Sequence, residues 1–203
     1  MQHRFRIAVQ AGTLVLLAGS AGAADFGDPT WPCIQRKVPE LSVGLMWPGP
    51  TDPAAIPPEA AADADSLAAR LALRRLPEAE LPPLVAAFTE AHGADEALLG
   101  AVFDKAFRPL SRTRSAIVAG IERYAAKQNA LAERIDGART EMDTLMAAAE
   151  PDFDRVDALE EQIDWDERIF DDRRRSLTYV CETPVLIEKR LYAVAQLLQS
   201  AVR

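Results

Sequence analysis

The chain has 203 residues, a formal net charge of −8 and a hydrophobic fraction of 49%. This length suits a single domain with its own core. An acidic protein is repelled by the phosphates of nucleic acid and by anionic membrane surfaces, so the composition argues against both as partners.

Residues 1–23 have the three parts of a secretory signal peptide. Arg4 and Arg6 supply positive charge, the stretch 7–18 is mostly apolar, and Ala21-Gly22-Ala23 provides the small residues of a cleavage site. A membrane anchor needs about 20 apolar residues, more than this stretch contains. We therefore expect cleavage after Ala23, a periplasmic location and no membrane insertion afterwards. Loss of the two arginines changes the net charge from −8 to −10.

The sequence contains two cysteines, Cys33 and Cys181, and an oxidising compartment favours their pairing. The alternatives are two free thiols or an intermolecular bridge. After signal cleavage His92 is the sole histidine, which excludes a His-rich zinc site or a two-histidine relay within one chain. Glycine-rich phosphate loops and the common hydrolase motifs are also absent. We therefore expect no catalytic residues, no metal site and no cofactor, and we predict that the protein is not an enzyme.

The segment 24–47 is expected to run extended, because the prolines in Trp31-Pro32-Cys33 and Val38-Pro39 forbid a long helix. We interpret it as a strap that burial and a disulfide hold against the body. The alternative is an exposed docking peptide presenting Trp31, Met46 and Trp47. Residues 48–60 contain five prolines and are predicted to form a semi-rigid linker.

The remaining residues, 61–203, form the predicted helical domain. Three short amphipathic helices come first, because apolar residues recur at the spacing of one buried stripe. The first spans about 62–76, the second runs from Leu81 to Gly93, and the third begins near Leu98 and ends before Pro109. We expect all three to pack on the base of a hairpin, near 110–124 and 177–200.

Beyond Pro109, an apolar residue recurs in alternating steps of three and four, the heptad pattern of a coiled coil. The pattern spans about 111–149, breaks at Glu150-Pro151, and resumes over 153–200. A connection this short makes the two helices antiparallel neighbours, with Asp152 or Asp154 as the cap of the second. The predicted fold is therefore all-α, built on a long antiparallel coiled-coil hairpin. Pro184 falls within the pattern, which favours a kinked but nearly continuous second helix over a fresh helix capped by Thr183.

Folding the chain about Glu150-Pro151 brings polar residues into the seam. Gln128 then faces Arg173, which predicts a polar core layer that fixes the register. Arg139 and Glu160 flank the seam at matching heights. Asp166 falls opposite Ile135 and has no evident partner.

The tip of the hairpin, roughly 129–172, is expected to project as an arm, and its second helix is rich in acids. Trp165 falls on the outer face, where a large aromatic is typical of a binding surface. We therefore predict an adaptor, an accessory subunit or a client-holding factor, whose partner is an unidentified envelope protein, with oligomer formation left open. The predicted contact residues are Trp165, Phe153, Asp164 and Asp166. The alternative is a metal-binding or metal-buffering protein that uses the acidic face of residues 152–172.

Overall fold

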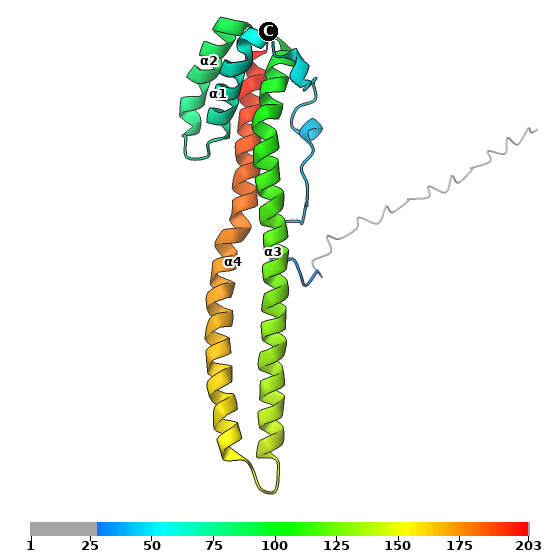
Figure 1. Cartoon of the computed structure of the whole chain (residues 1–203), viewed down its shortest axis with the longest axis vertical. Coiled ribbons are helices and arrows are strands. Elements are labelled where there is room, and N and C mark those ends of the chain that lie inside the picture. Colours follow the sequence, from blue (N-terminus) through cyan, green and yellow to red (C-terminus); the bar gives the residue numbers. More distant parts are fainter. Residues whose placement is uncertain (1–27, 203) are drawn as a thin grey trace, which may run out of the picture.

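The computed structural model describes residues 28–202 and contains four α-helices, with no strand in that range. The helices are α1 (Ala61–Ala72), α2 (Leu81–His92), α3 (Glu96–Met146) and α4 (Phe153–Ala201). The predicted all-α hairpin is confirmed, with α3 and α4 lying antiparallel along most of their length (Figure 1). The predicted signal peptide, residues 1–23, and the first residues of the strap lie outside the described residues.

Aspartates begin both long helices. The Asp95 carboxylate accepts hydrogen bonds from the backbone N–H groups of Ala97 (2.9 Å) and Leu98 (3.1 Å). Asp152, one of the two predicted caps, accepts from the N–H of Arg155 at 3.1 Å and begins α4. Each cap satisfies N–H groups that have no partner within the helix.

The third short helix was predicted wrongly, because α3 continues through Pro109 as one 51-residue helix. A proline inside a helix removes one N–H donor and costs about 3 kcal/mol. Here the residues on both sides of Pro109, among them Phe103, Phe107 and Leu110, are buried in the head. Burial of those side chains outweighs the local cost. In α4 the predicted continuous helix is confirmed at Pro184, since Thr183 donates to the Tyr179 carbonyl (3.4 Å) instead of capping a new helix.

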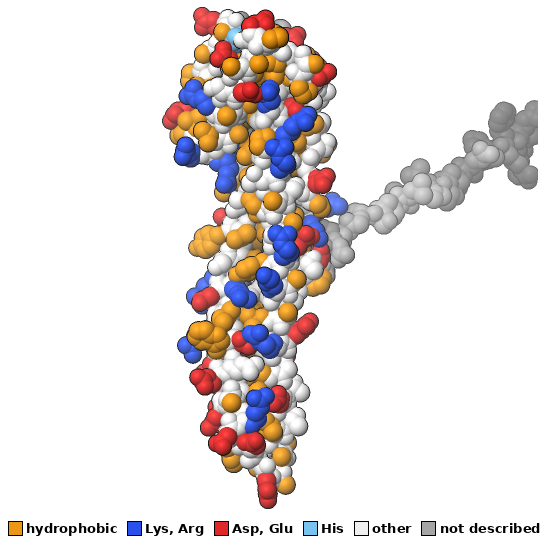
Figure 2. All heavy atoms as spheres, in the orientation of Figure 1, with side chains coloured by type: hydrophobic (Ala, Val, Ile, Leu, Met, Phe, Trp, Pro, Cys, Tyr) orange, Lys and Arg blue, Asp and Glu red, His pale blue; other side chains and the backbone are white. Residues whose placement is uncertain are grey.

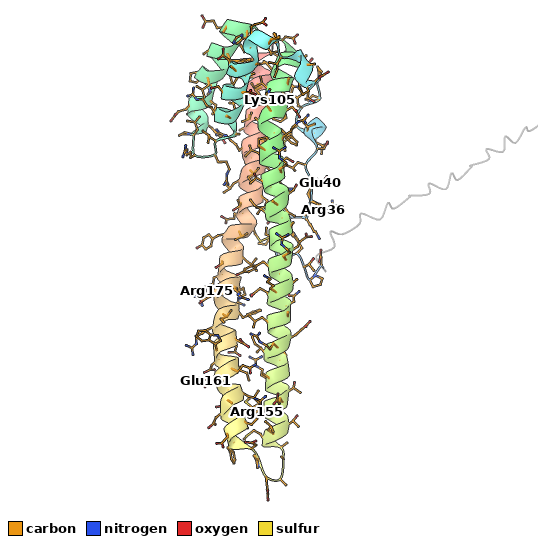
Figure 3. The ribbon with its side chains drawn as sticks, viewed as in Figure 1. Arg36, Glu40, Lys105, Arg155, Glu161 and Arg175 are labelled. Carbon is orange, nitrogen blue, oxygen red and sulfur yellow. A yellow bond between two sulfur atoms is a disulfide. The ribbon has the colours of Figure 1, made fainter. Side chains whose placement is uncertain are left out.

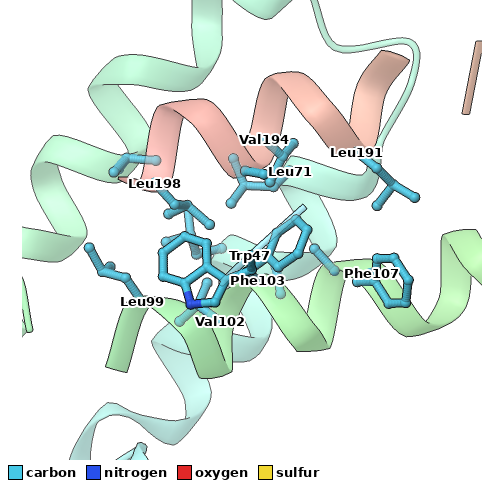
Figure 4. Close-up of a cluster of buried hydrophobic side chains, with 14 of the residues drawn as sticks. Trp47, Leu71, Leu99, Val102, Phe103, Phe107, Leu191, Val194 and Leu198 are labelled. Carbon is cyan, nitrogen blue, oxygen red and sulfur yellow. The ribbon is translucent and has the colours of Figure 1, made fainter. Parts of the chain in front are cut away.

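The head consists of α1 and α2 packed on the beginning of α3 and the end of α4. Leu71 and Leu81 from the short helices meet Leu99, Phe103 and Leu198 in one buried cluster (Figure 4). The buried part of α3 in this cluster spans 98–110, farther from the tip than the predicted 110–124. The shift follows from the continuity of α3 through Pro109, which lengthens the hairpin at its base.

The turn after α1 is held by Arg190 of α4, which is 4% exposed. Its guanidinium donates to the carbonyls of Leu71 (2.7 Å), Leu73 (2.9 Å) and Leu76 (2.9 Å). Burial lowers the pKa of Arg190, and nearby Glu78 opposes that shift. α1 ends at Ala72, four residues before the predicted Leu76, and the turn that follows supplies two of these carbonyls.

The strap runs along the hairpin and is tied to it at several points (Figure 1). The predicted Cys33–Cys181 disulfide is present, with 5.6 Å between the two Cα atoms. Nearer the head, Arg114 donates to the Val38 carbonyl at 2.7 Å. At the head itself Trp47 is buried and stacks on Phe103, with ring centroids 5.6 Å apart. The docking-peptide alternative is therefore wrong for Trp47.

A network of charges holds the first described residues of the strap. Lys37 contacts both Asp28, at 3.1 Å, and Glu122 of α3. Hydrogen bonds from the Thr30 hydroxyl, the Thr30 N–H and Lys37 lower the pKa of Asp28 to about 2. Contact with Glu122 and Asp28 raises the pKa of Lys37. Asp28 and Lys37 therefore stay charged throughout the ordinary pH range.

The proline-rich segment lies against α3 instead of standing apart as a linker. Its closest approach is at Gly100, where an added Cβ would lie 2.0 Å from the Pro50 carbonyl oxygen and 2.7 Å from the Trp47 indole nitrogen. Glycine is therefore needed at position 100 for the backbone of this segment to reach α3.

Substitution of this glycine provides a test of the close approach. Gly100→Ala is expected to lower the free energy of unfolding by about 1–3 kcal/mol, because the Pro50 backbone must move. The matched control is Gly137→Ala in the exposed part of α3, where an added Cβ meets nothing within 4 Å. That change is expected to stabilise the protein by about 0.5–1 kcal/mol. Urea denaturation of both variants measures the difference, and effects of equal sign would contradict the close approach.

Candidate interaction surface

The arm, residues 129–172, is the part of the hairpin that extends beyond the head and the strap (Figure 1). The last contact that the strap makes along the arm is the hydrogen bond from the Asn129 amide to the Pro29 carbonyl, at 2.8 Å. In the described residues beyond this point, α3 and α4 pack only on each other.

The interior of the arm is filled by its own side chains. Leu131, Ile135 and Ala138 of α3 meet Leu159 and Ile163 of α4 in a buried cluster. Met142, Leu145, Ile169 and Phe170 pack around it and are partly buried. Any contact with another molecule must therefore use the outer faces of the arm.

Asp166 was predicted as a contact residue for a partner, and the structure contradicts this. The Asp166 side chain is buried beside the seam and accepts two hydrogen bonds from Arg134 of α3. Arg134 Nε lies 2.7 Å from Oδ2, and Nη2 lies 2.5 Å from Oδ1. The pairing raises the pKa of Arg134. Arg134 directly precedes the seam residue Ile135, which faces Asp166 in the predicted register, so this pair could have been found from the sequence.

The predicted Gln128–Arg173 layer is also wrong. Gln128 is buried as expected, but its amide donates to the Phe170 carbonyl at 3.1 Å. The Arg173 side chain is exposed, and its backbone carbonyl accepts a hydrogen bond from the Tyr124 hydroxyl at 3.5 Å. The Gln128 NH2 group is thus satisfied by a helix carbonyl, while its Oε1 atom is buried and has no hydrogen-bond partner within residues 28–202.

Charges that flank the seam pair across it. Arg139 contacts Glu167 and not the predicted Glu160. Nearer the tip, Arg155 lies 2.7 Å and 2.9 Å from one oxygen of Glu141. These pairs are exposed and contribute little to stability, but they account for the flanking charges within the hairpin.

The outer face of α4 carries the predicted exposed aromatic. Trp165 is 62% exposed, and Phe153 at the beginning of the helix is 60% exposed. Asp164 is exposed beside Trp165. The remaining three predicted contact residues are therefore accessible, although Phe153 lies 12 residues, or about three helical turns, closer to the tip than Trp165.

Charge is unevenly distributed along this helix. On the face shown in Figure 2, acidic side chains predominate at the tip of the arm and basic side chains lie farther up, while the head carries both. The sequence of α4 has the same order, with acids predominant over 152–167 and four arginines over 168–175.

A second exposed apolar area, not predicted from the sequence, lies beside the disulfide. A groove of about 600 Å³ runs between the strap and α4, lined by Ile34, Leu177 and Leu186, with Arg174 and Lys189 at its rim. Tyr179 and Leu186 are exposed and fall two and three heptads after Trp165. That spacing is the signal that could have revealed this continuation of the outer face.

Within residues 28–202, no three His, Cys, Asp or Glu side chains converge where they could hold a metal ion. None of the helices in the same range is both long enough and apolar enough to cross a bilayer. No protein-family model, curated protein or solved structure matches the chain.

Proposed function

We propose that this chain is an exported, periplasmic interaction protein that acts as an adaptor, an accessory subunit or a client-holding factor. Its helical head forms a stable base, and its arm presents the outer face of α4 to a partner protein. The observation that carries the proposal is Trp165, which is more than half exposed on an arm whose interior is already filled.

An exposed tryptophan at this place contributes nothing evident to the fold. Leu159 and Ile163 of the same helix face α3 and complete the seam, while Trp165 points away from it. Tryptophan is among the residues that most often dominate binding energy at protein interfaces, because it buries a large rigid area on contact. A partner that covers Trp165 would gain that burial without rearranging the arm.

Export is supported by two features that agree. The first 23 residues have the pattern of a signal peptide. The Cys33–Cys181 bridge is of a kind that persists in oxidising compartments such as the periplasm.

Photo-crosslinking in intact cells tests the arm as a contact surface. A photoreactive amino acid at position 158, exposed one heptad before Trp165, leaves the tryptophan in place. We expect a discrete adduct, and we expect Trp165→Ala to reduce its yield about tenfold, the loss produced by 1.4 kcal/mol of binding.

The matched control places the same photoreactive residue at Glu133, which is exposed on α3. Trp165→Ala should leave the free energy of unfolding within about 0.5 kcal/mol of the wild type, as for other exposed positions. An adduct at position 158 that is equally strong with and without Trp165 would exclude this face as the binding surface.

A further inference from the structure

Four charged residues of α4 form a single column on the outer face. Asp154, Glu161, Arg168 and Arg175 follow one another at intervals of seven residues, and all four are exposed. Residues seven apart lie on the same side of a helix, about 10.5 Å from each other. Figure 3 shows Glu161 and Arg175 on the side of α4 that faces away from α3. The two acids lie nearer the tip, and the two arginines lie nearer the head.

Asp154 lies in the first turn of α4, where the helix dipole favours an acid, but the other three members of this column have no evident role within the described fold. Asp154, Glu161 and Arg168 form no ion pair with any residue of the range 28–202, and Arg175 has only Asp172, at 3.6 Å on its own helix. The charges that flank the seam, by contrast, pair with α3. The helix dipole acts only on the first and last turns, so it does not explain arginines in the middle of a 49-residue helix.

From the tip toward the head, the column has two acids followed by two arginines. A second copy of the column that runs in the opposite direction therefore places an arginine beside each acid. If two copies of α4 lie antiparallel about a two-fold axis, the column of one copy runs beside the same column of the other in the opposite direction. An axis between residues 164 and 165 sets Glu161 beside Arg168 of the second copy. The same axis sets Asp154 beside Arg175 of the second copy. Each pair occurs twice by symmetry.

Trp165 lies at the centre of the same arrangement. It belongs to the neighbouring column, which includes Ala158, Asp172 and Tyr179 at the same seven-residue interval and is exposed throughout. An axis next to Trp165 brings this side chain against its counterpart in the second copy. The exposed aromatic is then covered at the middle of the contact, and the ion pairs flank it, as is usual for a binding hot spot.

We propose that the outer face of α4 binds a second copy of this chain, antiparallel, with Trp165 at the two-fold axis. This inference rests on the proposed function, since it names a partner for the same face. The part of α4 that belongs to the hydrophobic cluster of the head begins at Ile187, 22 residues from Trp165, so the two heads would lie roughly 65 Å apart at 1.5 Å per residue. The assembly would present two heads facing in opposite directions, a form suited to bridging.

Charge reversal separates self-pairing from other contacts. Glu161→Arg alone places like charges together twice in the dimer, and we expect the dimer dissociation constant to rise at least about tenfold. Arg168→Glu alone should have the same effect. The double variant Glu161→Arg/Arg168→Glu restores opposite charges in both pairs and is expected to return the dissociation constant to within about threefold of the wild type. Sedimentation equilibrium measures all three.

Two controls keep the test specific. Glu133→Arg makes a similar charge reversal on α3 and should leave the dissociation constant unchanged. Circular dichroism establishes that each variant remains folded. If the double variant is no better than either single variant, the self-pairing of this column is overturned.

Cysteine cross-linking tests the position of the axis. Both native cysteines are occupied in one disulfide, so Asp164→Cys introduces the one free thiol of the described chain. Under mild oxidation we expect a covalent dimer from Asp164→Cys and none from Glu133→Cys. Cross-linking of equal yield at both positions would overturn the antiparallel arrangement.

The outcomes distinguish this inference from the broader proposal. Wild-type protein that remains a monomer up to about 1 mM, a concentration at which a weak dimer would form, overturns self-pairing. If a monomeric protein still gives an adduct with another protein that depends on Trp165, the proposed function stands and only the inference fails. A dimer that responds to the charge swaps supports the inference even where no other protein is captured.

Discussion

Replacing Cys33 and Cys181 together by serine is expected to lower the free energy of unfolding by about 5 kcal/mol. The bridge joins residues that are 148 positions apart. In the chain-entropy description, a cross-link that closes so long a loop restricts the unfolded chain by about that amount. Chemical denaturation of the double variant, followed by circular dichroism, measures the loss.

The reduced wild-type protein provides the matched control for this variant. A thiol reductant should bring the wild type to the stability of the serine variant and should leave the variant itself unchanged. The strap remains tied near the head by the Arg114 hydrogen bond to Val38 and by buried Trp47, so the helical content of the variant should stay close to that of the wild type. A loss below about 1 kcal/mol would show that the bridge does not restrain the unfolded chain in this way.

Arg190→Met is expected to lower the free energy of unfolding by about 3–5 kcal/mol. Methionine keeps much of the apolar stem but removes the three hydrogen bonds to the carbonyls of Leu71, Leu73 and Leu76. Each buried acceptor left without a donor costs about 1–3 kcal/mol, and the Leu71 carbonyl is fully enclosed. Thermal or urea unfolding measures the change.

Arg75→Met is the matched control, because Arg75 lies in the same turn and is exposed. Arg75→Met should change the free energy of unfolding by no more than about 0.5 kcal/mol. Arg190→Lys keeps the charge but not the planar group that reaches three carbonyls at once, so it should recover only part of the loss. Equal stabilities for Arg190→Met and Arg75→Met would mean that the turn after α1 holds without the guanidinium.

These two restraints lie at the head and along the strap, and neither touches the arm. Arg190 joins α4 to the turn after α1, while the disulfide joins α4 to the strap at the point where the apolar groove begins. Both variants should therefore leave contacts made through Trp165 intact at temperatures where the protein remains folded. Stability and interaction are consequently separable by mutation in this chain.

The hairpin could be predicted from the sequence because it depends on local patterns. A heptad seam is read along one helix at a time, and the break at Glu150-Pro151 requires only that a proline and a capping aspartate follow each other. The outward position of Trp165 follows from the same register. The Cys33–Cys181 pairing could be predicted because the sequence has only two cysteines.

Most polar contacts of the seam could not be predicted from the sequence in the same way. The sequence placed Gln128 and Arg139 at or beside the seam, but it did not identify the residues of α4 that they contact. Gln128 meets the carbonyl of Phe170, three residues before the predicted Arg173, a difference of about 4.5 Å along the helix. Arg139 likewise pairs with Glu167 and not with Glu160, a choice that only the packed hairpin makes. The exception is the pair of Arg134 and Asp166, which the predicted register already allowed.

The sequence by itself determined the helical class, the antiparallel hairpin with its turn at Pro151, and the exposed aromatic on the outer face. Only the tertiary structure decided that α3 passes through Pro109, that the proline-rich segment lies on Gly100, and that Arg190 closes the turn after α1. The physical reason is the range of the interactions. Periodicity and capping act over one or two helical turns, whereas a proline is tolerated, or an arginine buried, only when side chains distant in sequence supply the compensating contacts.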